Sequence, residues 1–217
     1  MAQELGRIER LSAERFTGKR KLFLVLLAHE PPPGAREGLV SLDRYWSQVQ
    51  SQVASLESSL GPVQQVYHEA LTEGGTQGLE QLQKATLGSY PLVRQQCDRG
   101  ATLQATEDEA LLLEVQDLQR CLMLPLFSYA VTTQLREWLS TRSRKRYEQI
   151  AERINETLSP GGVGLLIISE HHQVQFPGDI EVFYVRPPAL DEYHRWLEEW
   201  LNTQQKEATG GDSEQRV

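Results

Sequence analysis

The chain has 217 residues, of which 39% are hydrophobic and 24% are charged, and its formal net charge is −8. A chain of this length and composition can bury a globular core without disulfides or a structural metal. The negative charge disfavours a nucleic-acid partner, because the average field around the protein repels a polyanion. Cys97 and Cys121 are the two cysteines, and they are not at CxxC spacing, which argues against a four-thiolate zinc site and indicates a reducing compartment.

The longest apolar run covers residues 22–28, which is too short to span a bilayer. Charges are scattered through the first residues, so the N-terminus does not have the apolar stretch of a signal peptide. We therefore expect a cytoplasmic protein without a membrane partner.

The first part of the chain alternates between strand and helix patterns. A continuous apolar run (KLFLVLLAH) is typical of a strand buried on both faces of a parallel sheet, and apolar residues at helical spacing follow it. A strand, a helix and a second strand then form a right-handed βαβ unit. The predicted elements are a polar N-terminal arm over 1–20, a strand over 21–29, a helix over 39–60 and a strand over 63–68.

The middle of the chain has no strand pattern and predicts a run of helices, which glycine and proline residues separate. The predicted helices cover residues 76–87, 90–98, 106–123 and 127–158, the last as one long helix or two, so that 76–158 forms a helical insertion. Thr106 and Glu109 fit a capping box at the start of the third helix. The charged run from Arg142 to Arg146 is interpreted as a solvated segment of the fourth.

The C-terminal part returns to strands, predicted over 163–169 and 180–185, and ends in a helix that Pro187 and Pro188 introduce. Residues 203–217 are polar and are expected to form a disordered tail. Together these elements predict a single α/β domain over 21–202. Its expected architecture is a three-layer sandwich with a mostly parallel sheet of about four strands and a helical middle region.

Histidine and glutamate follow three of the predicted strands, at the point where each strand ends. The carboxyl ends of parallel strands share one edge of a sheet, which is where open α/β sheets bind their ligands. We therefore expect these side chains to converge. We call the residues that directly follow each of these strands its exit. The three exits are His29-Glu30, His68-Glu69 and Glu170-His171-His172.

Imidazole and carboxylate groups together suit Zn²⁺, Mn²⁺, Fe²⁺, Co²⁺ or Ni²⁺, so a divalent metal site is one hypothesis. The same groups without a metal could act as general acid and base on a small-molecule ligand. A third interpretation is that they are ordinary polar loop residues. The candidates are His29, His172, His68 and His171 as metal ligands, and Glu69 and Glu170 as catalytic carboxylates or further ligands.

Two classes of function follow from these features. The first is a metal-dependent enzyme, a hydrolase or a chelatase-like protein, that works at the carboxyl edge of the sheet. The alternative is a non-catalytic interaction module, RNA- or ribosome-associated, that uses the long helical region and the basic run from Arg142 to Arg146. A homodimer built on exposed helix faces is compatible with both.

Two segments, GATLQATEDEALLLEVQDLQRC and GLLIISEHHQVQFPGDIEVFYVRPPALDEYHRWL, resemble a family of uncharacterised bacterial and archaeal α/β proteins of about this length. This resemblance implies a shared fold and no particular activity. LFLVLLAHEPPP and VQQVYHEA resemble the small tetrapyrrole metal chelatases, which implies a metal-inserting role for His29, although Glu30 and Pro31 stand where those proteins have glycine and serine. GLLIISEHHQV is similar to the α/β domains of archaeal-type release factors, whose GGQ tripeptide this chain lacks.

Overall fold

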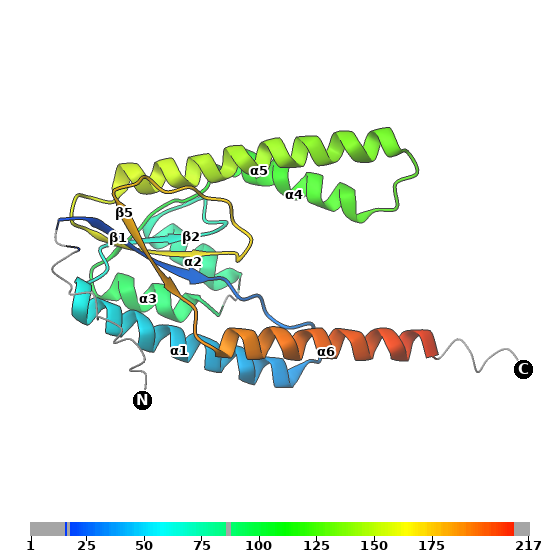
Figure 1. The fold of residues 1–217 in the computed structure, drawn as a ribbon, viewed down its shortest axis with the longest axis horizontal. Helices are drawn as coiled ribbons and strands as arrows, with labels where there is room; N and C mark the ends of the chain where they lie inside the picture. The colour runs from blue at the N-terminus through cyan, green and yellow to red at the C-terminus, as the bar shows by residue number, and fades with distance from the viewer. Residues whose placement is uncertain (1–15, 17, 86–87, 211–217) are drawn as a thin grey trace, which may run out of the picture.

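The computed structural model describes residues 16, 18–85 and 88–210 of the chain (Figure 1). They form a three-layer α/β fold, as the sequence predicts, with a helical region between the second and the fourth strand. The elements, in chain order, are β1 (Arg20–Leu26), α1 (Arg36–Leu60), β2 (Gln65–His68), α2 (Gly75–Lys84), α3 (Tyr90–Asp98), β3 (Thr102–Leu103), α4 (Glu109–Met123), α5 (Tyr129–Thr157), β4 (Val163–Ile168), β5 (Ile180–Val185) and α6 (Ala189–Gly210).

The sheet has the strand order β3-β2-β4-β1-β5, and all its pairings are parallel. It has five strands where the sequence predicts about four. The additional strand, β3, contains only two residues, which is too short to leave a periodic pattern in the sequence. Every residue of β1 and β4 is buried, which explains why both read as continuous apolar runs.

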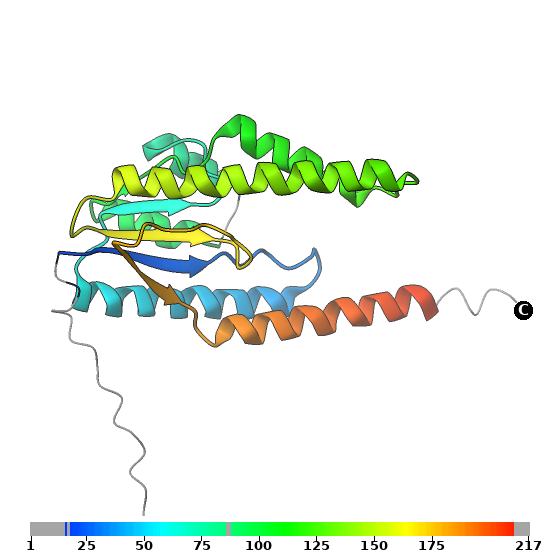
Figure 2. The ribbon, with the colours of Figure 1, turned by 45° about the horizontal axis from the view of Figure 1, so that its top comes forward.

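Helices cover both faces of the sheet. Figures 1 and 2 show α5 on one face and α1 with α3 on the other, while α6 lies against α1. The inner half of α5 contributes Ile150 and Ile154 to the core, and α1 contributes Tyr45, Val49 and Val53. The sheet is therefore enclosed between two helical layers.

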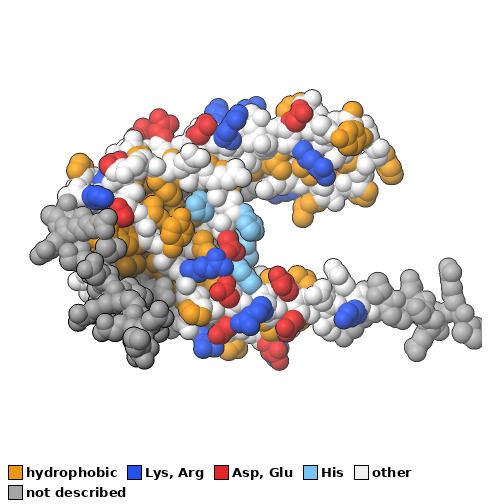
Figure 3. All heavy atoms as spheres, in the orientation of Figure 1, with side chains coloured by type: hydrophobic (Ala, Val, Ile, Leu, Met, Phe, Trp, Pro, Cys, Tyr) orange, Lys and Arg blue, Asp and Glu red, His pale blue; other side chains and the backbone are white. Residues whose placement is uncertain are grey.

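Two helical arms extend past the sheet on the side of its strand carboxyl ends. One arm is the hairpin of α4 and α5, and the other is the outer part of α6 (Figures 1 and 2). In the space-filling view, the surface between the arms is hollowed, and histidine side chains gather there (Figure 3). The carboxyl edge of the sheet therefore lies at the base of this hollow.

Some predicted boundaries differ from those in the structure. The N-cap of α4 is Asp108, which accepts a hydrogen bond from the Leu111 amide at 2.8 Å, so the predicted capping box of Thr106 and Glu109 is wrong. The hydroxyl of Thr106 accepts instead from the His68 amide at 3.1 Å. This bond between distant segments leaves no signal in the local sequence.

Both predicted chain ends lie partly outside the described residues. Residues 1–15 and 17 of the predicted arm and residues 211–217 of the predicted tail are among those outside. Within the described residues, Arg20 belongs to β1, and α6 continues to Gly210, well beyond the expected helix end at Asn202. None of the helices in the described part of the chain combines the length and the apolar character that a membrane span requires.

Candidate functional site

The three histidine-containing exits lie next to one another at the carboxyl edge of the sheet. Strand β4 pairs with β1 on one side and with β2 on the other, and both pairings are parallel. The prediction that the exits share one edge is therefore confirmed. The contacts made by each side chain decide what chemistry this edge can support.

The second and third exits are joined through the carboxylate of Glu69. It accepts hydrogen bonds from the Ser169 amide at 2.6 Å and from the Ser169 hydroxyl at 3.2 Å. It also accepts from the Arg146 Nη2 atom at 2.8 Å, which brings a residue of α5 to the edge of the sheet. Glu69 is thus bound by three donors of the protein itself.

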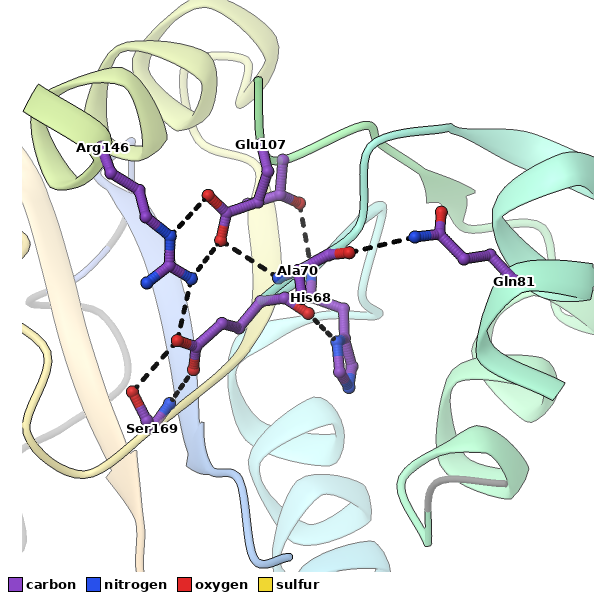
Figure 4. A network of polar contacts seen from close by, with 8 residues as sticks. His68, Ala70, Gln81, Glu107, Arg146 and Ser169 are labelled. Carbon is purple, nitrogen blue, oxygen red and sulfur yellow. Dashed lines mark hydrogen bonds and ion pairs between the residues drawn. The ribbon is translucent and has the colours of Figure 1, made fainter. Parts of the chain in front are cut away.

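Arg146 lies between Glu69 and a second carboxylate, that of Glu107. Its Nε donates to Glu107 at 2.8 Å, and its Nη2 donates to the other oxygen of that carboxylate (Figure 4). The side chain of Glu107 is only 1% exposed, and that of Arg146 is 9% exposed. The interpretation of Arg146 as part of a solvated run is wrong, because this guanidinium neutralises two carboxylates that the fold removes from water.

A tight turn after Glu69 completes the network. Ala70 has a φ of 64°, a left-handed conformation that is uncommon for a residue with a side chain. Its amide donates to Glu107 at 3.0 Å, and its carbonyl accepts from Gln81 at 3.1 Å, as Figure 4 shows. These two bonds hold the turn in place, so Glu107 binds both the exit of β2 and the arm helix α5.

The contacts in this network favour the ionised forms of Glu69 and Arg146. Burial raises the pKa of the Glu69 carboxyl, but the bonds from Arg146 and Ser169 outweigh it and place that pKa below its ordinary value. Burial also works against the charge on Arg146, and its bonds to Glu107 and Glu69 more than offset this, so the pKa of Arg146 is raised. Glu69 is therefore an ionised carboxylate engaged with the protein, rather than a free base.

His68 is fully buried beside this network. Its Nδ1 atom lies 2.6 Å from the Glu69 carbonyl oxygen, and its Nε2 atom lies 2.9 Å from the Ser89 hydroxyl oxygen. A carbonyl can only accept, so Nδ1 carries the proton, and Nε2 accepts from Ser89. Burial lowers the pKa of His68, which keeps the ring neutral.

The pairing of Ser89 with His68 has the geometry of a nucleophile and its base. Both side chains are 0% exposed, so a substrate does not reach them in this conformation. A pocket of about 500 Å³ lies nearby, and Trp46, Gly88 and Tyr90 are among the residues that line it. The contacts of His68 and Ser89 are those of a satisfied pair of core polar groups.

The first exit is open to solvent. His29 is exposed, and its backbone carbonyl accepts a hydrogen bond from the Tyr193 hydroxyl at 2.7 Å. This bond ties the loop after β1 to α6. After burial, which is the main cause, the imidazole of His29 also contributes to the lowered pKa of His68.

The third exit divides its side chains between different partners. His171 is exposed, whereas His172 is half-buried, and burial lowers the pKa of its ring. Glu170 forms an ion pair of 2.7 Å with Arg186 and lies 3.9 Å from the Nδ1 atom of His194. Glu170 thus turns toward β5 and α6, away from the Glu69 network.

The described residues contain no group of three or more His, Cys, Asp or Glu side chains placed to hold a metal ion. Among the candidate carboxylates, Glu69 is engaged by Arg146 and Glu170 by Arg186. The metal site and the catalytic roles therefore stay predictions, and the geometry adds no support to them.

A different feature stands out on the α4–α5 hairpin, far from the edge. Most of the large hydrophobic side chains that are exposed in the described residues lie on it, and Phe127 in the connecting loop is fully exposed. Figure 3 shows hydrophobic side chains at the far end of this arm. We call this set the hairpin tip: Met123, Leu124, Leu126, Phe127, Tyr129 and Val131.

Close to the hairpin tip, an open groove runs between the two helices. It has a volume of about 540 Å³. Its apolar lining comes from both helices, and charged side chains form its rim. The groove is lined by Leu118, Cys121, Leu135 and Trp138, with Glu114, Asp117 and Arg142 around them.

The comparisons with known proteins find no match. No protein-family model, curated protein or solved structure matches the chain. The resemblances described from the sequence therefore remain predictions.

Sequence reasoning missed Arg146, Ser89 and the hairpin tip. The first two are connected to the edge only by contacts across the fold, for which a single sequence carries no signal. The hairpin tip has such a signal, since Leu124, Leu126 and Phe127 are large apolar residues in a segment that Pro125 marks as a loop. Apolar residues in a loop between two helices indicate an exposed contact surface.

Proposed function

We propose that this protein is a non-catalytic protein-interaction module whose α4–α5 hairpin is the binding arm. The observation that carries the proposal is the gathering of exposed apolar side chains at the hairpin tip. Large exposed apolar patches on a protein surface mark contact sites. The aromatic residues Phe127, Tyr129 and Trp138 are of the kind that supplies much of the binding energy at interfaces.

The way in which the arm is attached supports this proposal. Arg146 belongs to α5, and Glu107 directly precedes the N-cap of α4, so their ion pair joins the two helices of the hairpin at their base. The bond from Arg146 to Glu69 then joins this base to the sheet. An arm fixed at its base has fewer orientations relative to the sheet to lose on binding.

The carboxyl edge also fits a structural role better than a catalytic one. Glu69, Glu170 and His68 each have partners within the protein. In this conformation none of these three groups is presented to a substrate as a free general acid or base. Glu69, Glu170 and His68 instead connect strand exits to the surrounding helices.

The basic run gives no comparable support for RNA as the partner. Arg146 is buried, and Arg142 forms an ion pair of 2.8 Å with Glu114. The net charge of −8 further opposes contact with a polyanion. We therefore propose a protein partner.

Site-specific photo-crosslinking tests the proposal. A photoreactive phenylalanine analogue is placed at Phe127, and in a second protein at Tyr184, an exposed aromatic residue of β5 that serves as the control. In extract of the source cells we expect one recurring protein adduct from position 127 and none from position 184. Absence of any adduct from position 127 would contradict the proposed function.

A further inference from the structure

We infer that the partner of the hairpin is a second copy of this chain, and that two hairpins pair around a two-fold axis. This inference rests on the proposed function, since it names the partner of the same surface. A two-fold interface requires a surface that is complementary to itself. The hairpin has both halves of such a surface.

The first half is a protruding side chain. Phe127 is fully exposed in the loop that joins α4 and α5. The second half is the groove between the same two helices, lined by Leu118, Cys121, Leu135 and Trp138. Each copy therefore has one apolar protrusion and one apolar groove.

The spacing of these two features suits an antiparallel pairing. Tyr129 begins α5 next to the protruding loop, and Trp138 lies about 14 Å further along that helix at 1.5 Å per residue. When two hairpins lie side by side and run in opposite directions, Phe127 of each enters the groove of the other. The two hairpins then form a four-helix arrangement with both grooves filled.

The charges of the two helices favour the same pairing. The rim of the groove has Glu114 and Asp117 from α4, whereas the outer half of α5 contains two arginines, Arg136 and Arg142, and one carboxylate, Glu137. In the antiparallel pairing that we infer, α4 of one copy lies beside α5 of the other. The side chains in the ion pairs that Glu114 and Asp117 make within the chain are 45–72% exposed, so these pairs are weak enough to exchange for bonds across the interface.

The position of the contact also limits repulsion between the copies. Each chain has a net charge of −8, so contact between the two bodies would bring like charges together. The Debye length is about 8 Å at physiological ionic strength. Contact at the ends of the long arms keeps the two bodies much further apart than this, because the part of α5 between Tyr129 and Arg146 spans about 26 Å at 1.5 Å per residue.

Sedimentation equilibrium of the full chain tests the inference. We expect the wild type to reach twice the 24.7 kDa mass of the chain. Phe127→Lys removes the protrusion, and Trp138→Glu places a charge in the groove, so each should raise the dimer Kd at least about tenfold. Tyr184→Lys alters an exposed residue of β5 and should leave the Kd unchanged.

Mixing the two weakened variants provides a sharper test. In a mixed dimer, Lys at position 127 of one copy meets Glu at position 138 of the other, while the second contact keeps its native Phe127 and Trp138. We therefore expect the equimolar mixture to dimerise more tightly than either variant alone. Circular dichroism and thermal unfolding confirm that each variant is folded.

The outcomes separate this inference from the proposed function. A wild-type chain that stays monomeric at its highest soluble concentration overturns the second-copy inference, but an adduct of position 127 with another protein would leave the proposed function standing. A dimer that neither substitution weakens would place the interface elsewhere. Failure of the mixture to recover would overturn the pairing of Phe127 with the groove.

Discussion

At the scale of single residues, the fold depends on one cation that joins two buried carboxylates. Arg146 binds Glu69 and Glu107, and their side chains are 13% and 1% exposed. Removal of one partner from such a network leaves charge in a poorly solvated place, which is far more costly than the loss of a surface ion pair. The contribution of Arg146 should therefore be visible in the free energy of unfolding.

We expect Arg146→Met to lower the free energy of unfolding by about 3–5 kcal/mol, because it leaves two buried carboxylates without their cation. Urea denaturation monitored by circular dichroism measures this change. Arg144→Met is the matched control, since Arg144 is exposed on the same helix, and it should stay within about 0.5 kcal/mol of the wild type. A loss of stability as small as that of the control would mean that the network does not hold α5.

The lowered pKa of His68 predicts that the stability of the fold depends on pH. Burial lowers the pKa of His68, so the folded protein keeps this ring neutral while the unfolded chain binds a proton below about pH 6.5. The unfolded state then binds more protons, so this contribution is complete above about pH 6.5 and is lost as the pH falls toward the folded pKa. His68→Gln should reduce the slope of the unfolding free energy by up to about 1.4 kcal/mol per pH unit between pH 6.5 and the folded pKa.

The measurement is a series of urea denaturation curves between pH 8 and about pH 5. His171→Gln is the control, because His171 is exposed and its neighbour His172 keeps its own contribution in both variants. Equal slopes for wild type and His68→Gln would show that the ring of His68 takes up its proton in the folded state as well.

At the scale of elements, α5 has two halves with different roles. Ile150 and Ile154 of its inner half are 0% exposed and belong to the core. Val131 and Trp138 of its outer half are 50% and 54% exposed. The inner half therefore stabilises the fold, whereas the apolar residues of the outer half contribute little to the stability of a single chain.

Two truncations in this one helix compare its halves. Ile150→Ala should lower the free energy of unfolding by about 2–5 kcal/mol, because it opens a cavity in the core. Val131→Ala should change it by no more than about 0.5 kcal/mol, because the removed methyl groups are half exposed. Chemical denaturation at a concentration where the chain is monomeric measures both. A large effect of Val131→Ala in the monomer would show that the outer half packs within its own chain.

At the scale of the whole molecule, two helical arms extend past the carboxyl edge of the sheet (Figure 1). The central strands β1 and β4 are buried throughout, so their amides open only on global unfolding. The outer part of the hairpin has few buried side chains and opens locally at low cost.

Hydrogen exchange tests this difference between body and arm. In dilute protein we expect amides of β1 and β4 to exchange slowest and those around the hairpin tip to exchange much faster. At high concentration the amides of the hairpin tip should become protected, because pairing of two hairpins removes them from solvent, while those of α1 should not change. Exchange at the hairpin tip that does not depend on concentration would contradict the pairing of two copies.

The sequence was sufficient for much of the fold. The extents of α3 and β5 were predicted to the residue, and α1, α5 and β4 to within a few residues. These predictions succeeded because apolar periodicity and flanking Gly and Pro are local properties of the chain. β3 was not predicted, because it depends on a pairing partner elsewhere in the chain. The N-cap of α4 was assigned to Thr106 although Asp108, which binds the Leu111 amide three residues later, is a favoured N-cap residue in the local sequence.

The neighbourhood of the candidate site was also predictable, but its chemistry was not. Parallel strands imply a shared carboxyl edge, so the sequence alone placed His29, Glu69 and His172 near one another. Only the tertiary structure decided that Glu69 is bound by Arg146, which lies 77 residues further along the chain. A local pattern reports burial and backbone conformation, whereas the partner of a charged side chain depends on how distant segments pack, and that partner determines whether a carboxylate can react or serves to hold the fold together.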